Sequence, residues 1–274
     1  MTELRIADLR FPEGPRWRDG TWWLSDQLGD RILRVGPDGA AAVVAEVHAP
    51  SGLGFLADGV LVAALMHEPS LVRAVGGTVE EIVDLRGVAG HLNDMFVDAA
   101  GRAYVDAYDD FNDQSTHRLL LVTPGADPVV ATAGLAFPNG VAITVDGATL
   151  VLSETFAGRI SAFDVATDGS LSGRRVWAQL PDGVNPDGLC LDERGDVWVA
   201  SYLSGEFLHV REGGEILDRF GFTDRWALSC SIGGDDGRTL LLCTSETTQR
   251  DYFAGRAVGH LETRRVDVPG VGRP

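Results

Sequence analysis

One short frame recurs six times along the chain, and this repeat limits the possible folds more than any other feature of the sequence. Four copies contain Pro-x-Gly, in FPEGPRW, APSGLGF, FPNGVAI and NPDGLCL, and two looser copies occur in HLNDMFV and ALSCSIG. The central residues of the frame are separated by 38, 42, 46, 48 and 42 positions. These central residues, which we call the anchors, are Glu13, Ser51, Asn93, Asn139, Asp187 and Ser229.

A turn glycine follows each anchor, seven residues later in the first copy and eight residues later in the other five. Four of these glycines come after aspartate, and Asp-Gly between alternating apolar residues is typical of a tight hairpin turn. A strand-like run comes next in every copy, such as TWWLSD, followed by a third candidate strand, such as RILRV. Five copies add a fourth strand. The pattern therefore predicts four-stranded units in which the anchor begins the first strand.

Six four-stranded units predict an all-β fold, a closed six-bladed β-propeller that forms a single domain over residues 1–274. The sixth copy runs out of chain after Val268, while a candidate strand at Leu4–Arg10 has no unit of its own. We therefore expect the N-terminal strand to complete the last blade, which also hides sheet edges that could aggregate. A β-sandwich would give no reason for a six-fold repeat, and the capped, periodic helices of an α/β fold are missing from the sequence.

The symmetry of a propeller would bring the anchors together, because the innermost strand of each blade lines the central channel. Glu13 and Asp187 are carboxylates, which repel each other in a narrow channel, and no anchor is basic. Oxygen donors without His or Cys are typical of hard ions. The sequence therefore predicts one divalent metal, with Ca²⁺ preferred and Mg²⁺, Mn²⁺ or Zn²⁺ as alternatives. An uncharged polar channel is the competing interpretation, because a single Asn-Gly or Asp-Gly is usually only a turn.

Composition argues against several kinds of chemistry and partner. All 23 basic residues are arginine, which excludes Schiff-base catalysis and phosphate loops that end in lysine. A net charge of −17 argues against binding to nucleic acid. No apolar run has the length of a signal peptide or a membrane span, and the three cysteines show no pairing pattern. These features predict a cytoplasmic protein without a membrane partner, and none of them bears on the oligomeric state.

The chain resembles the family of senescence marker protein, gluconolactonase and luciferin-regenerating enzyme from about Phe11 to Glu246. The resemblance is carried by FPEGPRW, HLNDMFVDAAGRAYV, FPNGVAITVDGATLVLSET, NPDGLCLDERGDVWVASY and LSCSIGGDDGRTLLLCTSE. It implies a six-bladed propeller with a divalent metal in its tunnel, often Ca²⁺, and hydrolysis of sugar lactones. It also implies that Glu13, Asn139 and Asp187 bind the metal, and that Asn93 faces the metal or the substrate.

Two positions depart from this family pattern, and both concern the substrate rather than the metal. His91 stands where sugar lactonases often have arginine, and Leu228 stands where threonine is commoner. The missing arginine weakens the expectation of a polyhydroxylated or acidic sugar lactone. We expect His91 to contact the substrate as a hydrogen-bond donor or a base, with a purely structural role as the alternative.

The predicted reaction is hydrolysis of a γ- or δ-lactone, either sugar-derived or more apolar. A divalent ion would polarise the carbonyl and stabilise the oxyanion, and Asp187 is the candidate for orienting or deprotonating the water. Direct attack by a carboxylate, which gives a covalent intermediate, is the rival chemistry. The alternatives are a phosphotriesterase on the same metal, since the arrangement more distantly resembles diisopropylfluorophosphatase, and a non-catalytic propeller that binds a protein.

Two long loops are expected to border the site, because the chain returns to the anchor end after each second strand. They span Asp106–His117 and Glu246–Arg256, and acidic side chains in such loops are expected to be solvated rather than catalytic. Their aromatic residues predict a partly apolar pocket, in which Tyr108 is a substrate-binding candidate together with His91 and Asn93. The aromatic residues are Tyr108, Phe111, Tyr252 and Phe253.

Overall fold

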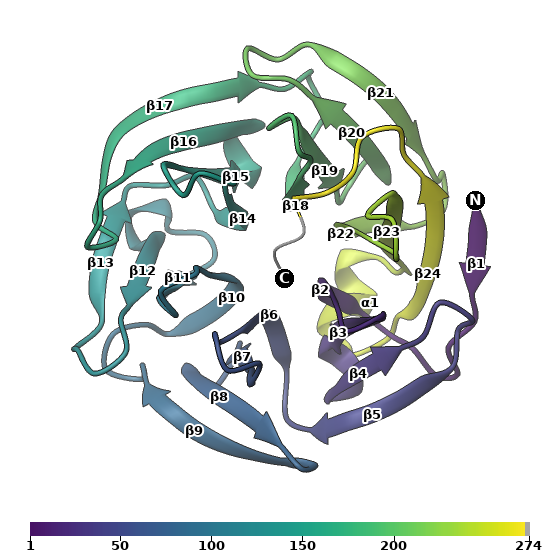
Figure 1. The fold of residues 1–274 in the computed structure, drawn as a ribbon, viewed down its shortest axis with the longest axis horizontal. Helices are drawn as coiled ribbons and strands as arrows, with labels where there is room; N and C mark the ends of the chain where they lie inside the picture. Colours follow the sequence, from purple (N-terminus) through teal and green to yellow (C-terminus); the bar gives the residue numbers. More distant parts are fainter. Residues whose placement is uncertain (272–274) are drawn as a thin grey trace.

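Six antiparallel sheets of four strands surround a central axis in the computed structural model, which describes residues 1–271 (Figure 1). The sheets are the blades of a six-bladed β-propeller, so the predicted fold class is confirmed. The predicted domain also includes residues 272–274, which lie outside the described part of the chain.

The strands follow the order of the sequence, each blade running from the axis outward, except that the sixth blade takes its outermost strand from the N-terminus. The first blade contains β2 (Pro12–Arg18), β3 (Thr21–Asp26), β4 (Arg31–Val35) and β5 (Ala41–Glu46). The second contains β6 (Pro50–Phe55), β7 (Leu61–Leu65), β8 (Ser70–Val75) and β9 (Thr78–Asp84). The third contains β10 (His91–Val97), β11 (Ala103–Tyr108), β12 (Arg118–Val122) and β13 (Val129–Ala133). The fourth contains β14 (Pro138–Ile143), β15 (Thr149–Glu154), β16 (Arg159–Val165) and β17 (Leu171–Gln179). The fifth contains β18 (Pro186–Leu191), β19 (Val197–Ser201), β20 (Glu206–Val210) and β21 (Ile216–Gly221). The sixth contains β22 (Trp226–Gly233), β23 (Thr239–Glu246), β24 (Val258–Arg265) and β1 (Thr2–Leu4).

The N-terminal strand closes the ring as predicted, but its predicted bounds Leu4–Arg10 are wrong. Strand β1 pairs with β24 over Thr2–Leu4, and the pairing ends at Leu4, which lies opposite Leu261. The chain then leaves the sheet, because it must cross from the outer edge of the sixth blade to β2 at the axis (Figure 1). Asp8, with a left-handed φ of 54°, lies in this crossing segment.

Burial explains why the strands differ in sequence. The second strands lie between two neighbours within a blade and between two blades, so β7 reads LVAAL and is buried along its whole length. The outermost strands face solvent, and β9 reads TVEEIVD with most of its residues exposed. The apolar side chains pack between blades, and the largest cluster joins the third, fourth and fifth blades.

A β-bulge interrupts every innermost strand at or next to its anchor. A bulge takes residues out of the hydrogen-bonded ladder and redirects their side chains, which accounts for the recurring frame around a variable central residue. The glycine of the frame is required by the neighbouring blade. A Cβ atom on Gly140 would lie 2.5 Å from the carbonyl oxygen of Asp187, in the innermost strand of the next blade.

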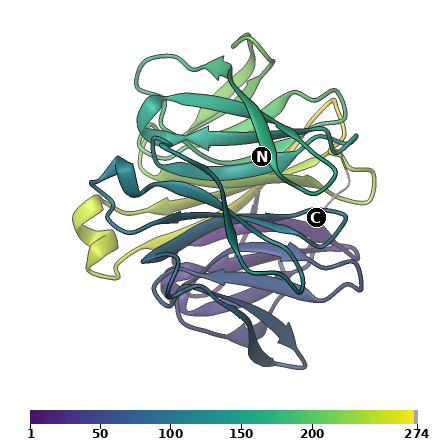
Figure 2. The same cartoon turned by 90° about the vertical axis from the view of Figure 1, so that its left-hand side faces the viewer.

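The described helices are all short, and each follows a second strand. They are η1 (Gln27–Gly29), η2 (Gln114–Thr116), η3 (Thr155–Ala157) and α1 (Gln249–Phe253). Figure 2 shows α1, in yellow, projecting from one end of the propeller. None of the helices in the described part of the chain is long and apolar enough to span a membrane. The cytoplasmic location and the absence of a nucleic-acid partner stay predictions.

Candidate functional site

A cavity of about 400 Å³ opens at the anchor end of the axis. Four of the six anchors line this cavity, and each of the four residues is at most 9% exposed. We call them the anchor ring: Glu13, Asn93, Asn139 and Asp187. The other two anchors, Ser51 and Ser229, are buried and do not line the cavity.

A chain of hydrogen bonds orients the two amides of the anchor ring. Ser51 Oγ donates to Asn93 Oδ1 over 2.8 Å, and Asn93 Nδ2 donates to Asn139 Oδ1 over 3.2 Å. Asn139 Nδ2 donates in turn to Thr155 Oγ1 over 3.5 Å. An amide oxygen has two lone pairs, so the oxygen of Asn139 keeps one lone pair that can bind a cation.

Burial of the two carboxylates of the anchor ring in their charged form is energetically unfavourable unless a cation lies nearby. Burial raises the pKa of Glu13 well above its usual range, and the charge of Asp187 raises it further. Burial also raises the pKa of Asp187, and the next cause is the charge of Asp94. None of the arginines in the described part of the chain lines the cavity. Such a site requires either protons or a bound cation.

Two further carboxylates, Asp94 and Asp106, lie near the ring and were missed by the sequence interpretation. Asp94 follows Asn93, at the position that four other copies fill with glycine, and burial raises its pKa to about 6. Asp106 in β11 is 1% exposed, and neither of its carboxylate oxygens has a hydrogen-bond partner. Burial and the charge of Asp94 raise the pKa of Asp106, and the nearby backbone of Asp94 and side chain of Asn93 offset this only in part.

Arg16 is the cation that faces Asp94, and its charge acts to lower the pKa of that carboxyl group. Its guanidinium group donates to the carbonyl oxygens of Pro15 and Met95 over 2.8 and 2.6 Å. A single guanidinium cannot balance the carboxylates of Glu13, Asp94, Asp106 and Asp187. The excess negative charge, the orphaned oxygens of Asp106 and the oxygen-only donor set therefore fit a hard divalent cation.

A second group of potential metal ligands lies at the other end of the fifth blade, where His209 of β20 meets the hairpin between β18 and β19. The ligand atoms of Asp192, Asp196 and His209 lie within 4.8 Å of one another. Asp192 is already hydrogen-bonded, however, because it accepts the backbone N–H groups of Arg194 and Asp196 and lies 3.0 Å from His209 Nε2. We interpret this group, the hairpin cluster, as a stabilised turn.

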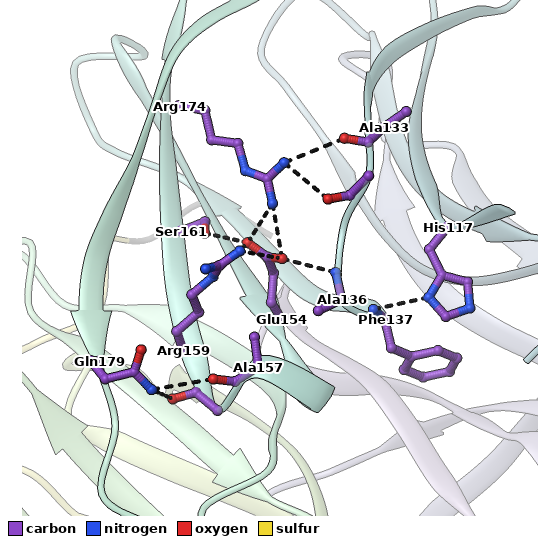
Figure 3. Close-up of polar contacts among 12 residues, drawn as sticks. His117, Ala133, Ala136, Phe137, Glu154, Ala157, Arg159, Ser161, Arg174 and Gln179 are labelled. Atoms are coloured by element: carbon purple, nitrogen blue, oxygen red, sulfur yellow. Dashed lines mark hydrogen bonds and ion pairs between the residues drawn. The ribbon is translucent and has the colours of Figure 1, made fainter. Parts of the chain in front are cut away.

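Glu154, at the end of β15, holds the segment that leads into the anchor strand β14. Its fully buried carboxylate accepts the N–H of Ala136 over 2.9 Å and pairs with Arg159 and Arg174 at 3.0 Å (Figure 3). His117 Nδ1 accepts the next N–H of the chain, that of Phe137, over 3.1 Å (Figure 3). These contacts position Asn139, two residues further on.

Asp26 has the same role in the first blade. Its Oδ1 accepts the N–H groups of Arg10 and Phe11 at 3.0 and 2.9 Å, just before Glu13, and its Oδ2 pairs with Arg31 at 2.9 Å. The expectation that acidic residues of the two long loops are solvated is wrong for Asp106, which is buried. Asp26 and Glu154, at the corresponding ends of the second strands in the first and fourth blades, are buried as well.

Two groups of aromatic side chains form the sides of the cavity. The first aromatic wall comes from the third and fourth blades, with Phe137 at its centre, 4.9 Å from both the Phe111 and the Phe156 ring. The second comes from the opposite side of the ring, where Tyr252 of α1 lies 4.9 Å from Phe11. The first wall contains Tyr108, Phe111, Phe137 and Phe156, and the second contains Phe11, Tyr202, Trp226, Tyr252 and Phe253.

Comparison with known proteins places the chain in a family. The sequence model of one protein family, described as the SMP-30/gluconolactonase/LRE-like region, matches residues 11–246 of the chain. The chain belongs to this family. It is 28% identical to pentonolactonase XacC of Haloferax volcanii, over all of this chain and 97% of that protein. It is 27% identical to 6-deoxy-6-sulfogluconolactonase of Pseudomonas putida, over all of this chain and 99% of that protein.

Solved structures of the SMP-30/gluconolactonase/LRE-like group share the fold. A calcium-binding protein, regucalcin, from Agrobacterium tumefaciens superposes with a TM-score of 0.81 and 17% identity, over all of this chain and 95% of that one. The luciferin-regenerating enzyme gives the same TM-score at 19% identity, over 98% of this chain and 96% of that one. Likeness at this level of identity shows the fold alone.

His91, which replaces the arginine that sugar lactonases of the SMP-30/gluconolactonase/LRE-like family often have, does not line the cavity. Its ring stacks on Tyr108 at 5.0 Å, and its Nδ1 lies 3.4 Å from Nδ1 of His67. His67 and Tyr108 do line the cavity, so His91 supports them from behind. No sequence pattern singled out His67, since an isolated histidine in a loop has no distinguishing neighbours.

Proposed function

We propose that the protein is a divalent-metal-dependent lactonase that opens a γ- or δ-lactone with water. The observation that carries this proposal is the anchor ring, which gathers two carboxylates and two amides from four blades at the base of one cavity. Two full-length relatives named as lactonases support the reaction. A structural relative described as calcium-binding supports the metal.

In this proposal Glu13, Asn139 and Asp187 bind the metal, and Asn93 faces the metal or the substrate. Their oxygen donors suit Ca²⁺ best, with Mg²⁺, Mn²⁺ and Zn²⁺ as alternatives. When bound, a divalent ion supplies Lewis-acid polarisation of the lactone carbonyl. Asn93 donates one N–H of its amide to Asn139 and its side chain also lies close to the carboxylate of Asp106, so it would face the metal or the substrate as part of a polar network.

Asp187 is the general base in this proposal. The oxygen of a water molecule bonds to the carbonyl carbon while Asp187 takes a proton from that water. The bond between the carbonyl carbon and the ring oxygen then breaks, and the proton passes to the ring oxygen to give a hydroxy acid.

The rival chemistry is attack by a carboxylate on the carbonyl carbon, and isotopic labelling separates the two routes. In a single turnover in H₂¹⁸O, direct attack by water leaves Asp187 and Glu13 unlabelled. A covalent acyl intermediate that is hydrolysed at the side-chain carbonyl would place ¹⁸O in one of these carboxylates, which peptide mass spectrometry detects.

Hydrolysis of γ- and δ-lactones, with aryl phosphate esters as a comparison, tests the proposed function. We expect lactone hydrolysis to be lost after chelation and restored by Ca²⁺. Asp187→Asn and Glu13→Gln should lower kcat/KM by at least about 100-fold, while Asp192→Asn in the hairpin cluster should retain activity. A fully active chelated protein would refute the metal dependence. Cleavage of phosphate esters in preference to lactones would favour the phosphotriesterase alternative.

A further inference from the structure

The cavity changes chemical character between its base and its sides. The anchor ring is polar and negatively charged, whereas the two aromatic walls contribute nine aromatic side chains. The chain has 23 basic residues, yet no arginine of the described part lines the cavity. His67 does line the cavity. Its burial, and to a smaller extent the charge of the nearby His91, lower the pKa of His67, which favours the neutral form at pH 7. The sides therefore offer no full positive charge to an anionic substituent.

Several polar groups of the cavity are already engaged with protein partners. The hydroxyl group of Tyr252 donates to Gln27 Oε1 over 2.7 Å, and Gln27 Nε2 donates to Ser51 Oγ over 3.5 Å. Thr155 Oγ1 donates to the carbonyl oxygen of Pro186 over 2.7 Å.

The hydroxyl groups of Tyr108 and Tyr202 and the indole N–H of Trp226 have no hydrogen bond to another described residue, but they are fewer than the hydroxyl groups of glucono-δ-lactone. A ligand with a hydroxyl group on every carbon would therefore lose more hydrogen bonds to water than it regains between the walls. Burial of unpaired polar groups is unfavourable, so such a ligand binds weakly.

We propose that the substrate is a neutral lactone with an apolar alkyl or aryl substituent, which lies between the aromatic walls while the lactone carbonyl meets the anchor ring. This inference rests on the proposed lactonase function and specifies its substrate class. Sugar lactones that carry sulfonate, phosphate or carboxylate groups are disfavoured, because the anchor ring repels them and the walls have no cation to pair with them.

A homologous series of lactones tests the role of the walls with the intact, Ca²⁺-loaded chain. The assay compares kcat/KM for δ-hexanolactone, δ-octanolactone and δ-decanolactone with that for glucono-δ-lactone and its 6-phosphate, after subtraction of spontaneous hydrolysis. Each methylene that becomes buried adds about a factor of four. Four added methylenes therefore predict an increase of up to about 200-fold from δ-hexanolactone to δ-decanolactone. We expect both sugar lactones to be at least 100-fold poorer substrates than δ-decanolactone.

A pair of variants in the fourth blade assigns this preference to the first aromatic wall. Phe156 lies at the cavity and is 37% exposed, whereas Val176 is 55% exposed on the outer strand β17 and does not line the cavity. Phe156→Ala should lower the ratio of kcat/KM for δ-decanolactone to that for δ-hexanolactone at least fivefold. Val176→Ala should leave the ratio unchanged. Phe156→Arg should raise the relative rate on the 6-phosphate, because it adds the missing cation.

The possible outcomes separate this inference from the proposed function. Equal kcat/KM values along the alkyl series, or preference for glucono-δ-lactone over δ-decanolactone, would overturn the substrate class and leave the lactonase assignment intact. An unchanged chain-length ratio in Phe156→Ala would overturn the assignment to the wall. A chain that hydrolyses none of these lactones would overturn both proposals together.

Discussion

Two buried acidic groups are candidates for the proposed metal site, and a matched pair of substitutions separates them. Asp187→Asn removes one carboxylate from the anchor ring, and Asp192→Asn removes one from the hairpin cluster. Both residues lie in or directly after β18, both are at most 7% exposed, and both substitutions keep the shape of the side chain. We expect only Asp187→Asn to abolish stabilisation by Ca²⁺.

The size of the expected effect follows from linkage and chain length. A ligand present at 100 times its Kd adds about 2.7 kcal/mol to the free energy of unfolding. The unfolding entropy is about 2.1 cal/mol/K per residue, which gives about 0.6 kcal/mol/K for a chain of 274 residues. Saturating Ca²⁺ should therefore raise the Tm of the unsubstituted chain by about 5 °C, and that of Asp187→Asn by less than about 1 °C.

The two variants should also differ without metal, and the pKa shift fixes the sign. The folded-state pKa of Asp187 lies above its unfolded value, so its contribution to stability is greatest at low pH and is lost as the pH rises through the folded pKa. At pH 7 the metal-free Asp187→Asn chain should therefore be more stable than the unsubstituted chain. Asp192 accepts three hydrogen bonds, which Asp192→Asn weakens. This substitution should lower the free energy of unfolding by about 1–3 kcal/mol and the Tm by about 2–5 °C, with or without Ca²⁺.

Calorimetry of chelator-treated protein measures the Tm of the unsubstituted chain and of both variants in one buffer, with and without added CaCl₂. NaCl at the same ionic strength controls for non-specific effects of salt, because Na⁺ is not among the proposed ligands of the site. A full Ca²⁺ shift in Asp187→Asn together with its loss in Asp192→Asn would refute the reasoning, because it would place the ion in the hairpin cluster. Loss of the shift in Asp187→Asn alone supports the anchor ring.

Two further substitutions test how the anchor strands are held. Glu154→Gln should lower the free energy of unfolding, measured in urea titrations at pH 7, by about 2–3 kcal/mol. Arginine and serine partners hold the pKa of Glu154 below its usual range. The difference in stability between the two chains should therefore vanish as the pH falls well below 4.5. Gly140→Ala should cost about 3 kcal/mol or more and weaken the Ca²⁺ shift, because its Cβ meets the β18 backbone. Gly147→Ala, whose Cβ meets no atom within 4 Å but whose φ is +75°, should cost only about 1–2 kcal/mol and keep the shift.

The blades could be predicted from the sequence because the signals that define them are local. Alternating apolar residues and turn glycines specify each strand and hairpin without knowledge of the rest of the chain. The N-terminal strand was misplaced for the same reason. Ile6 and Leu9 gave LRIADLR the pattern of a strand, but both side chains pack into the core between the first and sixth blades outside the sheet. An apolar pattern reports burial, and burial does not require strand pairing.

The carboxylates around the site show where local signals end. Glu13 and Asp187 were found because they occupy equivalent places in a repeat. Asp106 lies within an ordinary strand, AYVDAY, and its burial depends on closure of the whole ring. Asp26 and Glu154 carry no signal of their role in the local sequence, because their arginine partners lie in the next strands and the pairing appears only when those strands align.

The third blade sets the charge of the site, and this charge bears on both ends of the proposed reaction. Asp94 occupies a position that four other copies leave to glycine, and with Asp106 it doubles the number of carboxylates near the axis. Arg16 and a bound dication together offset three of these four charges, so the loaded site remains negative when all are ionised. A neutral lactone can enter such a site without repulsion. The hydroxy acid formed by hydrolysis is an anion at neutral pH, so the field that disfavours anionic lactones also favours release of the product.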